Sequence, residues 1–368
     1  MKIILTSNTS WNLFNFRKDL IKKMISKGHK VYVLAPFDKY TIKLKELGVI
    51  YHEIKLSRFH KTIFSDFLYI LKIFFKIYHI KPDLIHNFTL KPVIYVGIAA
   101  NFFKNIKVIN SITGLGLSFS NSKSFLNKFI LFLIKISFNK RYKFIFQNPD
   151  DINFFKKRKI LNSKQCYLIR GSGVEIQNYN KDSSKLNDVV VFGIMSRMLW
   201  SKGIKDFVDA SKILINKNLK IKFIILGSPD NNSPDSIPIS WLEEINKIDR
   251  ISWIPHKDNV YNFLKKIDVF VLPTYYPEGL PKSLLEAASM KLPLIATNTP
   301  GCKEIVKNNI NGFLVDIQNS NQLADKMYTL FSNQKLRIEM GNKSFEIVSK
   351  EFSIDLVIKK TLKVYNSI

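Results

Sequence analysis

Cysteine and acidic residues are scarce in this chain of 368 residues. Its only two cysteines, Cys166 and Cys302, lie far apart and show no spacing typical of metal ligands. We therefore expect neither a disulfide framework nor a zinc site, and we expect a reducing compartment, the cytoplasm. The composition is 46% hydrophobic and 23% charged, with no low-complexity tract, which excludes disordered and collagen-like chains. At about 150 residues per domain, two folded domains are predicted.

Long hydrophobic runs are also missing. The apolar run at the N-terminus, Ile3 to Leu5, is followed at once by polar residues, and it is too short for a signal peptide. No stretch reaches the ~18 uninterrupted apolar residues of a membrane span. Lys128 and Lys135 interrupt the most apolar helix candidate. We therefore expect a protein that is neither exported nor embedded in a bilayer.

Negative charge is lacking mainly in the first half of the chain. The sequence has 57 Lys and Arg residues against 29 Asp and Glu, a net charge of +28. Residues 1–185 hold 33 basic and 10 acidic residues, a net charge of +23. Such asymmetry indicates a polyanionic partner, either a nucleic acid or an anionic membrane surface.

Short β-branched runs alternate with helical patterns along the whole chain, which predicts βαβ units and parallel sheets. The predicted strands are residues 2–6, 30–34, 49–54, 83–86, 107–110, 144–147, 166–169, 189–195, 222–226, 250–253, 268–272, 294–296 and 312–315. Helices are predicted between them, among others at 12–27, 62–79, 92–103 and 124–139. The pattern indicates two doubly wound α/β domains joined by the polar segment 171–187. We expect domains at 1–180 and 188–350, a final helix at 351–368 that packs back on the first domain, and an active site in a cleft between the domains.

Several cofactor motifs are absent. No glycine-rich fingerprint follows the first strand, no glycine-rich lysine loop occurs, no Asp-x-Asp pair suits a metal-bound diphosphate, and the histidines are not clustered. We therefore expect no nicotinamide cofactor and no metal.

The segment from Asp268 to Glu286 contains the strongest candidate site. A buried strand is predicted to end at Pro273, and a turn with Glu278 precedes Pro281, where a helix can begin. Backbone amides at such a helix start can bind a diphosphate. The residues predicted for this diphosphate site are Gly279, Leu280, Pro281, Ser283 and Leu284, of which all but Pro281 have a backbone N–H. Glu278 and Glu286 can each accept hydrogen bonds from sugar hydroxyls. The alternative is a structural charge at the helix start and a solvated helix glutamate.

A second candidate site lies between the first strand and the first helix of the second domain, in Ser196 to Gly203. Arg197 offers a planar fork and Lys202 a point charge, which suits a nucleoside diphosphate whose leaving group gathers negative charge. Because lysine is common in this chain, an ordinary surface lysine is the alternative for Lys202.

Together these two segments resemble the donor site of the family 4 retaining glycosyltransferases. The resemblance covers essentially the whole chain, including Thr299 to Glu304 and Asn311 to Phe313. It implies the GT-B fold, with two Rossmann-like domains, and a UDP-sugar held mainly by the second. It further implies that Arg197 and Lys202 bind the donor diphosphate. Glu286 would bind the ribose, Glu278 with the Gly279 to Pro281 backbone the donor sugar, and Trp253 and Ile254, in the segment 253–257, would lie beside the nucleobase.

The resemblance also assigns roles in the first domain. His86, expected to close the fourth strand, would face the donor sugar as a second catalytic residue beside Glu278; a buried core histidine is the alternative. At Arg17, expected at the start of the first helix, the chain departs from the many relatives that have a glycine-rich turn there. We expect Arg17 to bind the acceptor diphosphate or to form a surface salt bridge. Thr113, Gly114 and Gly116 resemble the Gly-Leu-Gly loop of bacterial transferases that add N-acetylgalactosamine or another N-acetylhexosamine to polyprenyl-diphosphate-linked sugars. An ordinary strand-to-helix connection is the alternative for this loop.

Residues 59–81 and 123–143 combine dense aromatic and aliphatic residues with lysines. A helix that is apolar around most of its circumference suits a membrane interface, although core packing explains the same pattern. No nucleic-acid-reading motif is present.

The resemblance as a whole implies a retaining glycosyltransferase that moves an N-acetylhexosamine from a UDP-sugar to a polyprenyl-diphosphate-linked saccharide in surface polysaccharide or glycan synthesis. We place it peripherally on the cytoplasmic face of the inner membrane. A hexosyltransferase using glucose, galactose or mannose, and a basic membrane- or nucleic-acid-binding protein without transferase activity, are the alternatives.

Overall fold

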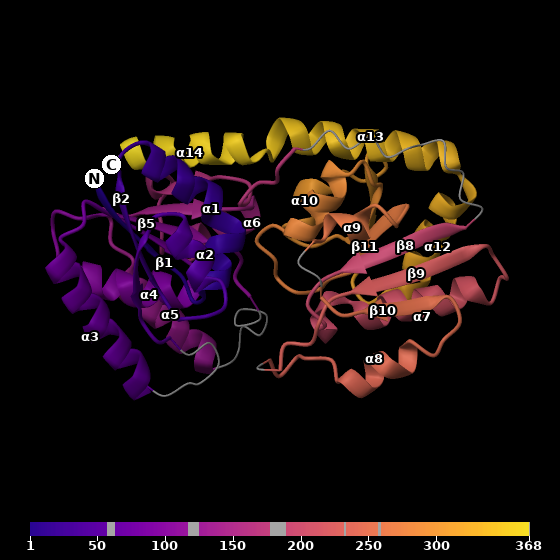
Figure 1. Ribbon diagram of the computed structural model, residues 1–368, viewed down its shortest axis with the longest axis horizontal. Coiled ribbons are helices and arrows are strands. Elements are labelled where there is room, and N and C mark those ends of the chain that lie inside the picture. Colours follow the sequence, from indigo (N-terminus) through magenta and orange to yellow (C-terminus); the bar gives the residue numbers. More distant parts are fainter. Residues whose placement is uncertain (57–62, 117–124, 177–188, 232, 257–258, 368) are drawn as a thin grey trace. The chain divides into compact units, whose positions relative to one another are not determined.

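A computed structural model of the chain describes residues 1–56, 63–116, 125–176, 189–231, 233–256 and 259–367. These residues form two compact units (Figure 1). Unit 1 consists of Met1–Ser172 together with Ile354–Ile368, and unit 2 consists of Gly173–Ser353.

Unit 1 contains a seven-stranded parallel sheet in the order β3-β2-β1-β4-β5-β6-β7. Its strands are β1 (Lys2–Thr6), β2 (Lys30–Ala35), β3 (Ile50–Glu53), β4 (Leu84–Phe88), β5 (Lys107–Ile112), β6 (Lys143–Phe146) and β7 (Cys166–Leu168). The central strands are apolar nearly throughout because both faces of this sheet are covered.

Helices cover both faces of the sheet of unit 1. They are α1 (Ser10–Ser26), α2 (Thr41–Glu46), α3 (Ile63–Ile80), α4 (Leu90–Ala100), α5 (Phe125–Ser137), α6 (Pro149–Lys157) and α14 (Ile354–Asn366). Helices α3, α4, α5 and α6 share one hydrophobic core with one face. Helices α1, α2 and α14 share another core with the opposite face. The last helix of the chain is therefore part of unit 1, where Val357, Thr361 and Tyr365 are buried.

Unit 2 contains a six-stranded parallel sheet in the order β10-β9-β8-β11-β12-β13. Its strands are β8 (Val190–Met195), β9 (Ile221–Leu226), β10 (Ile251–Ile254), β11 (Val269–Leu272), β12 (Leu294–Thr297) and β13 (Gly312–Val315). Its helices are α7 (Ile204–Ile215), α8 (Ile239–Ile245), α9 (Tyr261–Leu264), α10 (Lys282–Ser289), α11 (Cys302–Ile305), α12 (Ser320–Ser332) and α13 (Gln334–Glu351). In both sheets the strand order reverses beside the first strand, which is where ligands bind in such folds.

The predicted α/β class and all predicted strands are confirmed, with strand ends that differ by at most two residues. Two local predictions were wrong. His86 does not close its strand, because Asn87 and Phe88 continue the pairing of β4 with β5. Arg17 does not begin a helix, because α1 already starts at Ser10, where the Thr9 hydroxyl accepts a hydrogen bond from the Asn12 amide. Across the described ranges, no helix is both long enough and apolar enough to cross a membrane.

Candidate functional site

The connection from β8 to α7 places Lys202 beside the turn that follows β11. The backbone runs through a short 3₁₀ turn, Trp200–Lys202, and then through Gly203, whose φ is +74°. A Cβ atom on Gly203 would lie 2.0 Å from the carbonyl oxygen of Pro273. Only glycine therefore permits this left-handed backbone to pass so close to the end of β11.

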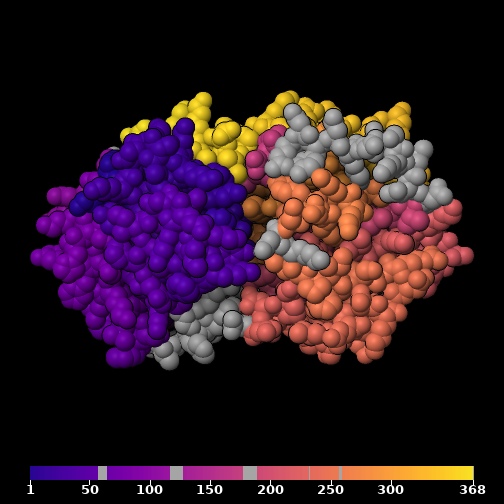
Figure 2. Space-filling model, in the orientation of Figure 1, coloured from indigo at the N-terminus to yellow at the C-terminus, as the bar shows by residue number. Residues whose placement is uncertain are grey.

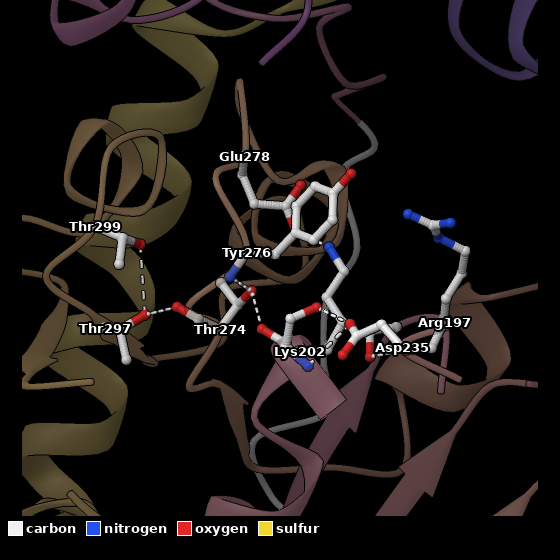
Figure 3. A network of polar contacts seen from close by, with 10 residues as sticks. Arg197, Lys202, Asp235, Thr274, Tyr276, Glu278, Thr297 and Thr299 are labelled. Carbon is white, nitrogen blue, oxygen red and sulfur yellow. Dashed lines mark hydrogen bonds and ion pairs between the residues drawn. The ribbon is translucent and has the colours of Figure 1, made fainter. Parts of the chain in front are cut away.

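Hydrogen bonds join this connection to the turn after β11. The carbonyl oxygen of Ser201 accepts hydrogen bonds from the backbone amides of Tyr275 (2.9 Å) and Tyr276 (3.0 Å) and from the hydroxyl of Thr274 (3.1 Å). The Ser201 hydroxyl in turn donates to the Asp235 carboxylate. The two segments predicted to bind the donor are thus a single hydrogen-bonded substructure of unit 2 (Figure 3).

Lys202 and Glu278 form an ion pair inside this substructure. The ammonium group of Lys202 donates a hydrogen bond to Oε1 of Glu278, and the side chains are only 9% and 17% exposed. The same ammonium group lies 4.7 Å from the centre of the Tyr276 ring. Burial, reinforced by the positive charge of Arg197, lowers the pKa of Lys202 to about 7, so this ammonium group releases its proton more readily than that of an exposed lysine. An ordinary surface lysine is excluded by this burial.

Arg197 lies on the same connection but points to a different acid. Its Nη1 donates to Oδ2 of Asp230 over 2.9 Å, and the Arg197 side chain remains 39% exposed. In Figure 3 its guanidinium stands apart from Glu278. Two cations therefore lie at the carboxyl ends of these strands. The guanidinium of Arg197 is accessible to a ligand from solvent, whereas the ammonium group of Lys202 is buried.

Glu286 lies in α10, the helix that follows the turn. It is 9% exposed, and its Oε1 lies 3.5 Å from Nζ of Lys282. Burial raises the pKa of its carboxyl, although Lys282 opposes this effect. The alternative of a solvated helix glutamate is therefore wrong.

The start of α10 is made by the residues predicted for it. Pro281 caps the helix in an extended conformation. The amide of Leu285 donates to the Pro281 carbonyl oxygen over 3.4 Å, which places Ser283 and Leu284 in the first turn, together with Lys282. Amides of a first turn have no acceptor further back in the helix, and they make its N-terminus attractive to anions.

Gly301 supports the turn that carries Glu278. A Cβ atom at Gly301 would lie 2.7 Å from the carbonyl oxygen of Gly279 and 3.0 Å from that of Glu278, and the φ of Gly301 is +82°. The next residue, Cys302, is fully buried, and burial raises the pKa of its thiol to about 11. This thiol therefore stays protonated and is a packing residue rather than a nucleophile.

Trp253 and Ile254, predicted to lie beside the nucleobase, end strand β10, which pairs with β9. Nε1 of Trp253 donates to the carbonyl oxygen of Gly227 over 2.9 Å. The carbonyl oxygen of Ile254 accepts from the Gly227 amide over 3.0 Å. Both residues thus lie at the same edge of the sheet as Arg197, whereas Lys257 lies outside the described residues.

In unit 1, His86 is enclosed. Its Nδ1 lies 2.7 Å from the Tyr365 hydroxyl and its Nε2 lies 2.7 Å from Oγ of Ser111. The residue is 1% exposed. Burial, with a smaller effect of the Arg17 charge, holds the pKa of His86 well below its ordinary value, so the ring is neutral. Because both ring nitrogens have protein partners, this geometry favours the core-histidine alternative.

Arg17 is buried beside this histidine, which excludes the surface salt bridge. Its guanidinium stacks 4.5 Å from the centre of the Phe88 ring, and its Nη1 donates to the Phe16 carbonyl oxygen over 3.3 Å. Burial lowers its pKa to about 10. A cavity of about 10 Å³ adjoins Arg17, His86 and Ser111, which is room for about one water molecule.

Thr113, Gly114 and Gly116 follow β5 and are partly exposed. Both glycines adopt positive φ angles, +114° and +66°, which explains why glycine occurs twice in three residues here. Residues 117–124, which follow in the sequence, lie outside the described residues.

Two family models match the chain. The model described as "Glycosyl transferases group 1" matches residues 175–346, and the one described as "Glycosyl transferase 4-like" matches residues 2–148. The chain belongs to this glycosyltransferase family. It is an enzyme of the GT-B fold, whose two parallel-sheet units match solved glycosyltransferases over their full length.

Two relatives of this glycosyltransferase are named for undecaprenyl-diphosphate-linked sugars. It is 24% identical to N,N'-diacetylbacillosaminyl-diphospho-undecaprenol alpha-1,3-N-acetylgalactosaminyltransferase of Campylobacter jejuni, over 100% of this chain and 99% of the relative. It is 26% identical to the Escherichia coli UDP-Gal:alpha-D-GlcNAc-diphosphoundecaprenol alpha-1,3-galactosyltransferase, over 76% and 77%. Anabaena Alr3699/HepE, solved in complex with UDP, superposes with a TM-score of 0.81 at 17% identity, with both chains fully covered.

Sequence reasoning missed several residues that shape the site of the glycosyltransferase. Asp230 and Asp235, which hold Arg197 and Ser201, follow strand β9 in a polar stretch with no distinguishing pattern. Tyr276, under the Lys202 ammonium group, lies within the segment already singled out, but its contact depends on a residue far away in sequence. Among the described residues, no three His, Cys, Asp or Glu side chains are grouped as metal ligands.

Proposed function

We propose that this glycosyltransferase moves a sugar from a UDP-sugar to a polyprenyl-diphosphate-linked saccharide, with retention of anomeric configuration. The observation that carries the proposal is the buried Lys202–Glu278 pair at the carboxyl ends of β8 and β11, flanked by Arg197 and Glu286. The acceptor class is supported by two relatives that are named for a diphosphoundecaprenol-linked acceptor.

The two cations would bind the donor diphosphate. As the bond to the sugar breaks, negative charge gathers on the diphosphate, and fixed cations in a buried site stabilise that charge. Lys202 would leave Glu278 and donate its hydrogen bond to a phosphate oxygen instead. The accessible guanidinium of Arg197 would donate to other phosphate oxygens. The first-turn amides of α10 and the backbone amides of Gly279 and Leu280, which precede Pro281, would donate hydrogen bonds to the diphosphate.

The two glutamates would bind the two sugars of the donor. Once Lys202 turns to the phosphate, the Glu278 carboxylate becomes an acceptor for hydroxyls of the transferred sugar and so orients the reacting carbon. Glu286, four residues along α10 from Lys282, would bind the ribose. Trp253 and Ile254 would lie beside the base.

Retention requires that the acceptor hydroxyl enter on the face from which the diphosphate departs. In our proposal an oxygen of the departing phosphate takes the hydroxyl proton, so no protein nucleophile is assigned. Lys202 and Arg197 supply the positive charge that a divalent cation provides in other transferases, and we therefore propose a reaction that needs no metal.

For the donor sugar we propose an N-acetylhexosamine, with N-acetylgalactosamine first. The relative from Campylobacter jejuni, which matches over nearly its full length, is named as an N-acetylgalactosaminyltransferase. Galactose is the second candidate, because the Escherichia coli relative is named for UDP-Gal. The product would be a repeat unit of a surface polysaccharide, O-antigen or capsule, or of a protein glycan.

For the acceptor we propose contacts in unit 1. Arg17 has no carboxylate partner within the described part of the chain, so it is the candidate cation for the acceptor diphosphate. The cavity beside it is small, so binding would require side chains there to move. Thr113, Gly114 and Gly116 would contact the acceptor glycan. A His86 contact with the donor sugar would require one of its two hydrogen bonds to break. We further propose peripheral attachment to the cytoplasmic face of an anionic membrane and no nucleic-acid partner.

A donor-by-acceptor screen tests the proposal. The purified full chain is incubated with each of a panel of UDP-sugars and a synthetic polyprenyl-diphosphate-linked N-acetylhexosamine, and NMR of the lipid product reports the anomeric configuration. We expect an α-linked product from an α-configured UDP-N-acetylhexosamine, unchanged by EDTA. Transfer of hexoses alone would replace the donor assignment, and a β-linked product would overturn retention.

A further inference from the structure

Helix α3 has two opposite apolar faces. One face is buried against the sheet and includes Tyr69, Ile73 and Ile77. The other face is exposed and contains large apolar side chains spaced three or four residues apart. They are Phe64 (72% exposed), Phe67 (55%), Leu68 (39%), Leu71 (38%), Phe75 (56%) and Tyr78 (56%). Because residues at this spacing lie on one side of a helix, they form a continuous stripe that no described part of the chain covers.

Further exposed apolar side chains lie on other elements of the same helical layer. On α5, Phe129, Phe132 and Ile136 are exposed on the side opposite its buried residue Ile134. Phe102, which follows α4, is 73% exposed and touches Phe74 of α3 at 5.8 Å between ring centres. Figure 2 shows purple atoms of this part of unit 1 at the surface, on the left of the view.

A basic groove of about 520 Å³ lies beside this stripe. It is lined by Lys2, Lys72, Lys76, His52 and His79, with Glu53 as its one carboxylate. Phe75 belongs to both the stripe and the lining of the groove, so the apolar surface and the cations are contiguous. Three lysines against one glutamate give the groove a net positive charge even with both histidines neutral.

The walls of the groove are held by contacts within the unit. The ammonium group of Lys76 donates to Nδ1 of His52 over 3.3 Å, so that nitrogen carries no proton. The His52 ring lies nearly parallel to the Tyr32 ring, with 6.2 Å between centres. Nζ of Lys2 donates to the Ile80 carbonyl oxygen over 3.0 Å. The ammonium groups of Lys2 and Lys76 are therefore held by uncharged partners.

We propose that this groove binds the phosphate of an anionic phospholipid headgroup while the exposed stripe of α3 enters the apolar layer beneath it. The inference rests on the peripheral attachment proposed above and names the surface and the lipid chemistry that attachment would use. Charge complementarity selects this occupant: apolar contact alone would suit a second copy of the chain, but a cationic groove joined to the stripe suits a bilayer whose headgroups are anionic.

Vesicle flotation of the full chain tests the groove. Vesicles are made of phosphatidylcholine with or without phosphatidylglycerol. The double variant Lys72→Gln/Lys76→Gln is compared with Lys22→Gln/Lys23→Gln, which removes two exposed lysines of α1 on the opposite face of the sheet. Both variants lose the same net charge. We expect the groove variant to lose roughly tenfold in apparent affinity for the anionic vesicles and the control less than about twofold.

Two further variants should change the affinity for anionic vesicles in opposite directions. Glu53→Gln removes the single carboxylate of the groove and should strengthen binding to phosphatidylglycerol vesicles by a few fold. Phe64→Ser/Phe67→Ser, at exposed positions, should weaken binding to them by roughly tenfold or more. Equal losses for the two lysine pairs would overturn the groove, because general charge would then explain attachment. Self-association detected by light scattering, and abolished by Phe64→Ser/Phe67→Ser, would overturn the membrane as occupant.

Calorimetry with soluble short-chain lipids separates the headgroup from free phosphate. We expect dihexanoyl-phosphatidylglycerol to bind wild type but not Lys72→Gln/Lys76→Gln, and dihexanoyl-phosphatidylcholine to bind neither. Inorganic phosphate that binds as tightly as the lipid would overturn the lipid assignment. Sugar transfer to a water-soluble acceptor should be the same in wild type and this variant. If neither wild type nor this variant transfers a sugar, the proposed function is rejected. The vesicle experiment would then still test the groove by itself.

Discussion

The ammonium group of Lys202 and the carboxylate of Glu278 meet in a buried ion pair, although they are 76 positions apart in the chain. Each neutralises a charge that would otherwise be costly to bury. The pair also joins the two segments that we assign to the phosphate and to the sugar of the donor. Donor binding would therefore separate the pair, giving Lys202 a phosphate and Glu278 a set of hydroxyls.

Lys202→Met tests the phosphate role of the ammonium group. Turnover should fall on the order of 100-fold, the usual loss for one preorganised electrostatic contact, and UDP should bind more weakly. Lys205→Met is the control, because Lys205 is exposed on the first turn of α7 and pairs with Asp209; it should keep activity within about twofold. Wild-type turnover in Lys202→Met, measured in single-turnover assays, would contradict the assignment.

Arg197→Ala should also lower turnover by roughly 100-fold and weaken UDP binding. Asp230→Asn should act differently, because it removes the charge of the acid that holds Arg197 but leaves the guanidinium available to the diphosphate. We expect its UDP affinity to be unchanged or higher in titration calorimetry. If Arg197→Ala stays within twofold of wild type in both affinity and turnover, Arg197 does not bind the donor.

Substitutions of the two glutamates should affect different quantities, the rate of transfer for Glu278 and the affinity for UDP for Glu286. Glu278→Gln should slow single-turnover transfer ~10- to 1000-fold, because the charge-assisted sugar contact is lost. UDP affinity should be unchanged or higher, because the ion pair with Lys202 no longer competes with the diphosphate. Glu286→Gln should chiefly weaken UDP itself. Equal losses of UDP affinity in both variants, with lower melting temperatures, would mean that both glutamates only stabilise the start of α10.

Gly301→Ala tests whether the turn that carries Glu278 must keep its position. The new Cβ would lie 2.7 Å from the Gly279 carbonyl oxygen, so we expect the turn to shift and transfer to fall more than tenfold. Gly28→Ala is a matched control: its φ is +77°, but nothing lies within 4 Å of the new Cβ. Both variants put an alanine at a positive φ angle, which costs roughly 1 kcal/mol or more. If they lose the same activity, contact with the turn is irrelevant.

His86 should make the melting temperature depend on pH. Its pKa is lowered in the folded state by burial, so as pH falls below about 6.5 the unfolded chain takes up a proton that the folded chain refuses. Stability is then full above this range and declines below it, by up to ~1.4 kcal/mol per pH unit. Tyr365→Phe should lower the melting temperature at every pH and keep this dependence. His86→Gln should reduce it, and an unchanged dependence would place His86 in solvent.

The fold was predictable because both sheets are buried on both faces, and buried strands read as short β-branched runs. Residues Lys2 to Thr6 and Gly312 to Val315 were placed without error. Strand ends were harder to place. Asn87 and Phe88 extend β4 by pairing with Asn110 and Ser111. Three of these four residues are polar, so no continuous apolar pattern marks the end of the strand.

The composition of the candidate site was also predictable, whereas its contacts were not. Arg197, Lys202, Glu278 and Glu286 stand in segments with recognisable spacing. The Lys202–Glu278 pair and the hydrogen bond between His86 and Tyr365, 279 positions apart, depend on which loop ends meet at the edge of a sheet. Sequence spacing does not determine distances across strands, so partners such as Asp230 and Tyr276 appeared only with the structure.

The central claim is sugar transfer to a lipid diphosphate by the Lys202–Glu278 site. The most direct measurement is mass spectrometry of the polyprenyl-diphosphate-linked product formed from a UDP-N-acetylhexosamine by wild type and by Glu278→Gln at equal, saturating UDP-sugar. We predict a product heavier by one N-acetylhexosamine residue from wild type, formed at least tenfold more slowly by Glu278→Gln. Equal rates in the two enzymes, or only free sugar and UDP with no lipid-linked product, would contradict the account.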